Sequence, residues 1–323
     1  MNRIKFILLT IAASTLLFSC KKDDEAPLEP PRDRTTQYAA DIIDIEDYLK
    51  SHYLTVTFDA NQNPLPTITK IEEGGTETSI WDQTEYPLTH EMFKNDVREF
   101  TTANPYVGER IDDPVDYKIY YLNIREGVGE VPSKADSLFT SHRGTLLDDR
   151  QFDISQNPVW LAQIGSRTSG AVISGWRNIL SKFKTGTAVG NPDDGTVTYQ
   201  DYGVVVAFIP SGLAYYDKPQ GGIIPQYAPL VFTINLHSIK RKDDDLDGIL
   251  SVNEDLNGNG DLYDDDTDGD GIPNFMDFDD DGGGFPTLTE ISDSFGNRFP
   301  FELIPNCQGT TGGLKKHLNL NCH

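Results

Sequence analysis

The middle third of the chain combines several strand patterns with one helix pattern, and this combination restricts its fold more than any other feature. Apolar runs and alternations predict strands at 116–125, 138–139, 203–209 and 230–239. In the last of these strands, Phe232, Ile234 and Leu236 fall on one face. Strands gathered around a single helix indicate an α+β domain with an antiparallel sheet.

The helix pattern begins at Ser174, whose hydroxyl is a suitable N-cap. Its apolar face is made of four residues at helical spacing, namely Trp176, Ile179, Leu180 and Phe183. Gly186 is the expected stop signal. An Asn-Pro-Asp-Asp-Gly turn within 187–202 then predicts a lengthened surface hairpin, with a flap near the site as the second interpretation.

Four short segments follow one another in a fixed order through this region. They are Phe152-Asp153, the run from Val172 to Trp176, the run from Ile209 to Tyr215, and Ile224-Pro225 followed by the run from Leu230 to Phe232. Together they resemble the FKBP family of peptidyl-prolyl cis-trans isomerases, over about a third of the chain. The resemblance implies a curved antiparallel sheet wrapped around one short helix, and an enzyme that accelerates rotation about X-Pro bonds.

The same resemblance implies roles for individual residues. Trp176 resembles the floor of a proline pocket, and Phe152, Tyr215 and Phe232 resemble its aromatic walls. Tyr215 also resembles the donor to a substrate carbonyl. Asp153 resembles a buried carboxylate that helps to orient the site. These five residues form the predicted catalytic set.

Four further residues are predicted to contact the substrate. Val172 and Ile173 resemble the segment whose backbone meets the bound peptide, Ile173 through its amide, and Ile224 resembles an apolar rim. His142, in His142-Arg143-Gly144, stands where the family usually has Tyr-x-Gly, so an imidazole replaces a phenol.

Two other positions depart from the family pattern. Val159 stands where an aromatic residue is common, and Tyr216 stands where Gly is usual. The departures bear more on rate and ligand affinity than on fold. Ordinary core packing is the alternative interpretation of each aromatic residue taken alone, whereas the ordered set favours a pocket.

An X-Pro bond can be rotated without breaking any bond. Amide resonance sets a barrier of about 18 to 20 kcal/mol, and a site that stabilises the twisted amide relative to the planar one lowers it. No nucleophile, proton donor or cofactor is therefore needed for isomerisation. The sequence also contains no Gly-x-Ser-x-Gly, phosphate-loop or His-Glu-x-x-His motif.

The first residues predict export and lipid attachment. Arg3 and Lys5 precede an apolar run at 6–18, which is too short for a membrane span and is typical of a signal peptide. The tetrapeptide ending at Cys20 resembles a bacterial lipobox, which implies acylation of that cysteine. An ordinary signal peptide with an incidental cysteine is the alternative.

The region at 35–114 cannot be assigned to a known structural unit from its sequence. A helix capped by Thr36 is expected, with Ile42, Ile45, Leu49 and Tyr53 on its buried face. Strands are expected at 54–58 and 67–71, and 86–100 is mixed. We interpret the region as an accessory segment that packs beside the isomerase domain, with a second active site as the alternative.

An acidic segment at 243–281 contains no Lys or Arg and repeats the spacing of a calcium loop. In the EF-hand pattern, oxygen ligands occupy positions one, three, five and twelve, with Gly at position six. The repeats resemble thrombospondin type 3 calcium repeats, which implies a calcium-stiffened stalk or cap. The predicted structural Ca²⁺ ligands are Asp243, Asp245, Asp247, Glu254, Asp255, Asn257, Asn259, Asp266, Asp268, Asp270 and Asp277.

The first three loops begin at Asp243, Asp255 and Asp266, and Asp266 is shared by the second and third loops. A fourth loop runs from Asp279 through Asp281 to Glu290 and has Gly283 in place of a ligand, so weak binding or none is expected there. The alternative interpretation of the whole segment is a solvated acidic linker, because unpaired repulsion would keep it disordered without ions.

The last two cysteines, Cys307 and Cys322, are predicted to form a disulfide, with a free pair as the alternative. The net charge is -24, which argues against a nucleic-acid partner.

The expected organisation is a signal peptide at 1–19, a lipidated tether at 20–34, the accessory region at 35–114, the isomerase domain at 115–240, a loop-rich calcium segment at 241–290 and a tail at 291–323. The predicted task is isomerisation of proline-containing exported polypeptides by a membrane-anchored lipoprotein, expected at the outer membrane and facing the periplasm or the cell surface. A non-catalytic peptide-binding chaperone and a calcium-dependent surface structural protein are the alternatives.

Overall fold

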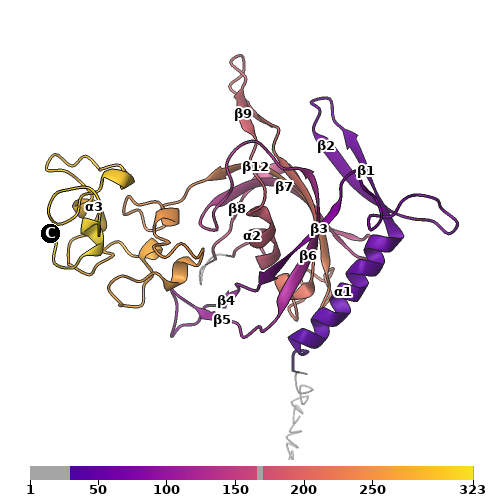
Figure 1. Ribbon diagram of the computed structural model, residues 1–323, viewed down its shortest axis with the longest axis horizontal. Coiled ribbons are helices and arrows are strands. Elements are labelled where there is room, and N and C mark those ends of the chain that lie inside the picture. Colours follow the sequence, from indigo (N-terminus) through magenta and orange to yellow (C-terminus); the bar gives the residue numbers. More distant parts are fainter. Residues whose placement is uncertain (1–29, 166–169, 323) are drawn as a thin grey trace, which may run out of the picture. The chain divides into compact units, whose positions relative to one another are not determined.

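The computed structural model describes residues 30–165 and 170–322 (Figure 1). Cys20, the predicted signal peptide and most of the predicted tether lie outside the described residues. Within the described ranges, no helix has both the length and the apolar character needed to cross a bilayer.

Six antiparallel strands form the central sheet. In spatial order they are β3 (Leu88–Lys94), β6 (Asp116–Arg125), β11 (Gly203–Ile209), β12 (Leu230–Lys240), β7 (Ser137–Leu146) and β8 (Gln151–Ala162). The mixed helix and antiparallel-sheet class predicted from the sequence is therefore confirmed. The strands expected at 116–125, 203–209 and 230–239 match β6, β11 and β12, whereas the strand expected at 138–139 is the much longer β7.

The central strand β11 is buried along its whole length because both faces of the sheet are covered. On one face, Val205, Ala207 and Ile209 join the core that contains α2 (Ser174–Leu180). On the other face, Val206 and Phe208 pack with residues of α1 (Arg34–Ser51). Successive side chains on a strand alternate between faces, so a continuous apolar run serves both cores.

The N-terminal region takes part in this sheet. It supplies β3 at one edge and α1 over one face, where Ile45, Tyr48 and Leu49 are buried (Figure 1). The expected strand pair is a separate hairpin of β1 (His52–Phe58) and β2 (Pro64–Lys70). Two short strands, β4 (Arg98–Glu99) and β5 (Glu109–Arg110), pair beyond β3.

The start and end of α1 differ from the expectation. Asp33, and not Thr36, is the N-cap, because its carboxylate accepts hydrogen bonds from the Thr36 amide at 2.8 Å and from the Thr36 hydroxyl at 2.9 Å. The helix ends at Ser51, so Tyr53 lies in β1 and not on the helical face. Helical spacing continued by chance into the strand.

The predicted signals for α2 were also misplaced. Ser174 lies in the first turn instead of capping it, and its hydroxyl donates to Asp96 at 2.6 Å. The helix ends at Leu180, well before Gly186, although Phe183 is still buried in the same core. The expected hairpin at 187–202 is present as β9 (Thr187–Gly190) and β10 (Val197–Gln200).

The C-terminal part is loop-rich and contains short helical turns. They are η2 (Ser251–Asn253), η3 (Leu262–Asp264), η4 (Asn274–Met276), α3 (Thr287–Glu290), η5 (Phe301–Leu303) and η6 (Lys316–Leu318). Two small apolar clusters support it, one around Leu262 and Phe275 and another around Ile249 and Ile291. Cys307 and Cys322 form a disulfide, with Cα atoms 5.3 Å apart.

The close approach of α2 to β11 depends on Gly175. A Cβ atom at this position would lie 2.5 Å from the side chain of Ile209, which is fully buried. We expect Gly175→Ala to lower the free energy of unfolding by about 1 to 3 kcal/mol through overpacking, measured by chemical denaturation. Gly190→Ala is the matched control, since no atom lies within 4 Å of the added Cβ. Equal stability of the two variants would contradict this packing.

Candidate functional site

A cavity of about 270 Å³ lies between α2, the sheet and the segment before α2. The predicted residues that line it come from four elements and two connecting segments, and are His142, Asp153, Val172, Ile173, Trp176, Tyr215 and Phe232. Leu161, Ala162, Gly170 and Ala171 also line it and were not predicted, because they lie outside the four segments that carry the resemblance. The sequence therefore identified most of this cavity.

Edge-to-face ring contacts build the apolar part of the cavity. The Trp176 and Phe232 ring centroids lie 5.0 Å apart at 90°, and the His142 and Trp176 centroids lie 5.0 Å apart at 81°. Such pairs stabilise aromatic packing beyond their buried area. The Trp176 side chain is almost entirely buried, and its indole N–H has no acceptor among the described residues.

Phe152 and Ile224 do not line the cavity. Phe152 packs behind it, with its ring centroid 5.3 Å from that of Phe232. Gly144 makes room for this pair, since a Cβ there would lie 2.5 Å from the Phe152 ring. Ile224 is buried in the main core and is not an exposed rim. Phe152 therefore supports the cavity wall from behind, whereas Ile224 is part of the core.

Asp153 is not the buried carboxylate that was expected. It lies on β8, the edge strand of the sheet, and its side chain is 54% exposed. One carboxylate oxygen lies 3.1 Å from Nε2 of His142. The edge position leaves Asp153 open to solvent, and the imidazole that departs from the family pattern is its partner.

The segment that carries Tyr215 is held by the N-terminal helix. Asp41 on α1 is fully buried and accepts hydrogen bonds from the Ser211 amide at 2.8 Å and from the Ser211 hydroxyl at 2.6 Å. Ser211 begins the turn η1 (Ser211–Leu213), which leads to Tyr215. Burial raises the pKa of the Tyr215 hydroxyl, and the Asp153 carboxylate adds to this effect, so the phenol remains a hydrogen-bond donor.

The start of α2 is held by Asp96, which follows β3. Its carboxylate accepts from the Ser174 hydroxyl and pairs with Arg177 and with Lys134, the latter at 3.0 Å. Burial opposes ionisation of Asp96, but Arg177 and Lys134 outweigh it and keep its pKa well below the usual range. Asp96 therefore remains charged and fixes the helix that carries Trp176.

Four acidic loops in the C-terminal part adopt one repeated turn. In each loop the amide of the sixth residue, a Gly with positive φ, donates to the carboxylate of the first. The pairs are Gly248 with Asp243, Gly260 with Asp255, Gly271 with Asp266 and Gly284 with Asp279, at 2.8 to 3.2 Å. The incomplete fourth loop thus shares this hydrogen-bonded turn with the other three.

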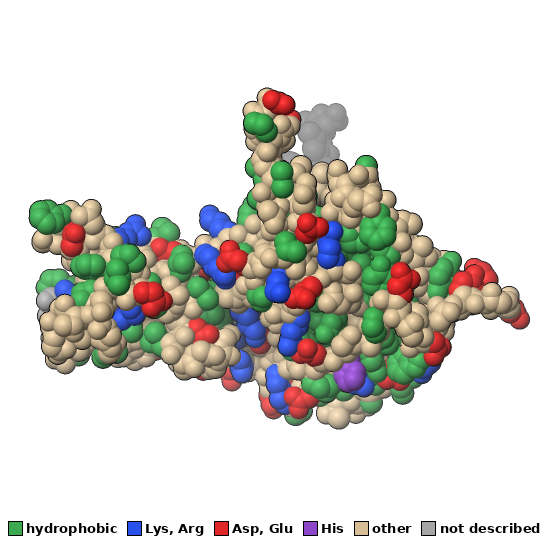
Figure 2. All heavy atoms as spheres, turned by 45° about the horizontal axis from the view of Figure 1, so that its top comes forward, with side chains coloured by type: hydrophobic (Ala, Val, Ile, Leu, Met, Phe, Trp, Pro, Cys, Tyr) green, Lys and Arg blue, Asp and Glu red, His purple; other side chains and the backbone are tan. Residues whose placement is uncertain are grey.

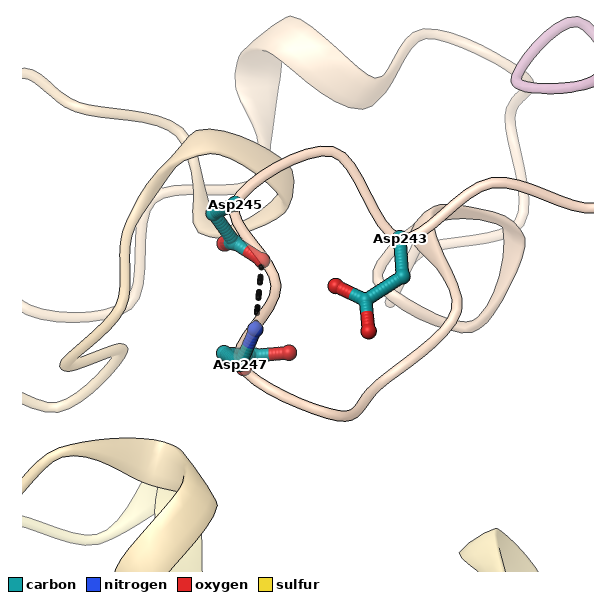
Figure 3. Close-up of side chains that lie close together, drawn as sticks. All are labelled: Asp243, Asp245 and Asp247. Carbon is teal, nitrogen blue, oxygen red and sulfur yellow. Dashed lines mark hydrogen bonds between the residues drawn. The ribbon is translucent and has the colours of Figure 1, made fainter.

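Carboxylates converge inside these turns. Figure 3 shows Asp243, Asp245 and Asp247 around the interior of the first turn, with the Asp247 amide donating to Asp245 at 3.2 Å. Single oxygens of these three residues lie within 4.8 Å of one another, as do those of Asp266, Asp268 and Asp270. Asp277 is also buried. Burial raises the pKa of its carboxyl, and the nearby charges of Asp270 and Asp268 raise it further.

A third group joins residues from two loops. Asp247, Glu254 and Asp280 are all buried and bring oxygens within 4.8 Å of one another. Glu254 is 2% exposed, and neither of its oxygens has a partner among the described residues. Asp280 was not predicted as a ligand, because it lies in the second position of the fourth loop, where the pattern requires none.

The second loop also contains an unpredicted buried acid. Asp265 precedes the shared Asp266 and accepts from the Asn257 side chain at 3.1 Å. Its other oxygen has no partner in the described ranges.

Crowded buried carboxylates require compensation. Burial raises the pKa of Glu254 to about 11, and the charges of Asp245 and Asp280 add to this effect. For the same main reason the pKa of Asp280 rises to about 9. An unpaired buried charge is costly, whereas a divalent cation bound by oxygen ligands removes that cost. The donor set, all oxygen and flexible in spacing, fits calcium.

Comparison with known sequences finds peptidyl-prolyl isomerases and their relatives. FK506-binding protein 1 of Dictyostelium discoideum is 30% identical over 119 residues, which are 36% of this chain and 94% of that protein. The outer membrane protein MIP of Legionella longbeachae is 28% identical over 123 residues, which are 38% of this chain and 45% of that protein. The chain spans about half the length of the curated relatives that it matches first.

Two further matches concern structure and the C-terminal part. A crystal structure of a peptidyl-prolyl cis-trans isomerase from Pseudomonas syringae is 27% identical, with a TM-score of 0.30, over 38% of this chain and 76% of that chain. Residues 244–312 match a family model described as BamM C-terminal.

The Asp96 network predicts a pH-dependent loss of stability. Asp96→Asn leaves Arg177 largely buried beside a neutral group, so we expect a loss of about 3 kcal/mol in the free energy of unfolding at neutral pH. The depressed pKa means that this contribution is present above about pH 4 and is lost as the pH falls through the folded-state pKa. Urea titrations should show the wild type and variant converging in acid.

Asp148→Asn is the control for this experiment, because Asp148 pairs with Arg150 on the surface and both side chains are more than half exposed. Such pairs contribute at most about 1 kcal/mol. A difference between wild type and Asp96→Asn that stays constant from neutral to acid pH would contradict the assignment.

Proposed function

Since the chain belongs to the FKBP family of peptidyl-prolyl cis-trans isomerases, we propose that it accelerates rotation about X-Pro bonds in exported polypeptides. The observation that carries this proposal is the shared cavity of Trp176, Tyr215 and Phe232. These side chains come from α2, from the segment after η1 and from β12, so their convergence is a property of the fold. The alternative is a module that binds proline-containing peptides without catalysing their isomerisation, and the activity test below distinguishes the two.

Desolvation is the physical basis of the proposed catalysis. A planar amide is more dipolar than a twisted one and is better stabilised by water, so an apolar cavity favours the twisted form. A typical enzymic rate of about 10 per second, starting from about 0.01 per second, needs only about 4 kcal/mol. Aromatic enclosure of the proline ring together with a hydrogen bond can supply that amount.

The cavity residues have separate parts in this mechanism. Trp176 and Phe232 form the apolar surface for the proline ring, and both are 4% exposed. The Tyr215 hydroxyl donates to a carbonyl oxygen of the bent peptide. Val172 and Ile173 line the cavity, and the Ile173 amide is the proposed main-chain donor to the bound peptide. His142 and Asp153 form the polar side of the opening.

We further propose that the acidic loops bind structural calcium. The support comes from the repeated turn, from the three groups of converging oxygens and from the buried carboxylate of Glu254, which has no partner among the described residues. When bound, the cation supplies positive charge that allows the carboxylates to pack. The chain's own residues supply the turns, and Asp280 ties the first loop to the fourth.

A third proposal concerns location. We propose that Cys20 carries the lipid anchor of an envelope protein. The N-terminal pattern supports this proposal, and the Legionella longbeachae relative is named an outer membrane protein.

Removal of the Trp176 ring should reduce the activity. We expect Trp176→Ala to lower kcat/KM for an exposed X-Pro peptide by about tenfold or more, because the apolar surface for proline is lost. A protease-coupled proline-isomer assay on protein lacking residues 1–20 measures this effect. Trp176→Phe, which keeps an apolar ring, should retain more activity than Trp176→Ala.

Trp81→Ala is the control for a general loss of tryptophan packing, since Trp81 is partly exposed and lies outside the cavity. If the wild-type protein binds proline peptides but never accelerates their isomerisation, the enzyme proposal fails and a non-catalytic binding module takes its place.

Calcium should protect the C-terminal part from proteolysis. We expect millimolar Ca²⁺ to slow cleavage within 241–290 and a chelator to accelerate it, because the cation offsets carboxylate repulsion. Glu254→Gln should shift this protection to higher Ca²⁺ concentration, whereas Glu302→Gln, at an exposed position in η5, should not. Limited proteolysis followed by mass spectrometry measures both. Identical fragment patterns with Ca²⁺ and with chelator would overturn the calcium proposal.

A further inference from the structure

A second cavity, which we call the side cleft, lies beside the cavity lined by Trp176, Tyr215 and Phe232, which we call the proline cavity. It has a volume of about 340 Å³ and shares with the proline cavity the lining residues Gly170, Ala171, Val172, Ile173 and Tyr215. The two cavities therefore lie next to each other along the segment that leads into α2. A polypeptide that places a proline beside Trp176 has neighbouring residues within reach of the side cleft.

The outer walls of the side cleft come from regions outside the four segments that identify the family. One wall contains Arg98, Phe100 and Arg110, which lie on or beside the β4–β5 pair. The facing wall is the second acidic loop, which contributes Asp261 and Tyr263. The Phe100 and Tyr263 ring centroids lie 5.8 Å apart, so the two walls touch.

The side cleft is positively charged within a strongly acidic chain. Its described lining contains four cationic side chains, Arg98, Arg110, Lys134 and Arg177, and two carboxylates, Asp96 and Asp261. Two positive charges are therefore left over, although the chain as a whole has a net charge of -24. Figure 2 shows Lys and Arg side chains gathered where the C-terminal part meets the sheet domain.

Each carboxylate of the side cleft is shared by two cations. One oxygen of Asp261 lies 2.7 Å from Arg98 and 3.1 Å from Arg110, and Asp96 pairs with both Lys134 and Arg177. Arg110 is 52% exposed, so it can turn to another carboxylate without leaving a buried charge unpaired. Lys134 is also accessible, at 32% exposed. These two residues supply the surplus positive charge to an incoming chain.

From this arrangement we infer that the side cleft selects polypeptides that carry carboxylate side chains close to the proline to be isomerised. The inference rests on the proposed function, because the proline cavity fixes the register of the bound chain. Ion pairs with Arg110 and Lys134 provide the selection, and the Phe100 and Tyr263 rings provide apolar contact for the side-chain stems. Elsewhere the acidic surface repels such chains, so the side cleft also directs their approach.

Matched peptides test the inference. Unstructured peptides with one Ala-Pro bond are prepared with two Glu residues before it, with two Glu residues after it, or with Gln at the same positions. At low salt we expect one Glu peptide to exceed its Gln counterpart by about threefold to tenfold in kcat/KM and in affinity measured by fluorescence anisotropy. The advantage should fall as salt is added.

Charge-removing variants locate the effect. Arg110→Gln and Lys134→Gln should each bring the ratio between Glu and Gln peptides towards one. Lys50→Gln, which removes one positive charge from α1 outside the side cleft, should preserve the ratio. Circular dichroism of each variant checks its fold. If one variant misfolds, the other still provides the test.

The outcomes separate this inference from the proposed function. Equal affinity and equal kcat/KM for Glu and Gln peptides overturn the inference and leave isomerisation intact. Preferential binding of a Glu peptide without any isomerisation overturns the proposed activity and supports the side cleft. An advantage that persists unchanged in both Arg110→Gln and Lys134→Gln assigns selection to another surface and also overturns the inference.

Discussion

The carboxylate of Asp96 is the interaction on which the site most depends. It lies beyond β3, in a region that the family resemblance does not cover, and it binds both Ser174 and Arg177 at the start of α2. That helix carries Trp176 into the proline cavity. A buried carboxylate is tolerated only where cations and hydrogen-bond donors compensate its charge. Removal of one partner leaves the other as an unpaired buried charge, which destabilises the fold. Asp96 thus fixes the cavity floor and one wall of the side cleft with a single charge.

A second link connects the N-terminal helix to the same cavity. The buried carboxylate of Asp41 receives both donors of Ser211, and the chain continues from Ser211 to Tyr215. The central strand β11 leads into this turn and is packed on both faces, by α2 and by α1. The region before residue 115 is therefore part of the structure that positions Tyr215. Its polar contacts orient the aromatic residues, while the resemblance accounts only for the residues that line the cavity.

Local sequence patterns predicted the elements that carry strong periodicity and failed where long-range partners decide. The strands β6, β11 and β12 could be recognised because apolar alternation is visible in the sequence, whereas most of the cavity lining was implied by the resemblance of four ordered segments to the family. The exposure of Asp153 was not predictable, since it follows from the position of β8 at the sheet edge. Likewise Ser174 looked like a cap because its true partner, Asp96, is remote in sequence. Asp280 could not be found from loop spacing, because its carboxylate lies beside Asp247 and Glu254 of the first loop and not among the spaced positions of the fourth.

The second acidic loop belongs to two parts of the molecule at once. Its first and third residues, Asp255 and Asn257, hold the turn through which the loop would retain a cation, while Asp261 and Tyr263 form a wall of the side cleft. The Tyr263 hydroxyl also donates to the main chain of Gly165 at 2.7 Å, and both residues line the side cleft. Cation binding to this loop lowers the free energy of the turn relative to its unfolded forms, and by linkage it stabilises every contact that the turn makes. Calcium would therefore stabilise the wall of the side cleft that an acidic proline-containing chain would meet, although the two bind at different atoms.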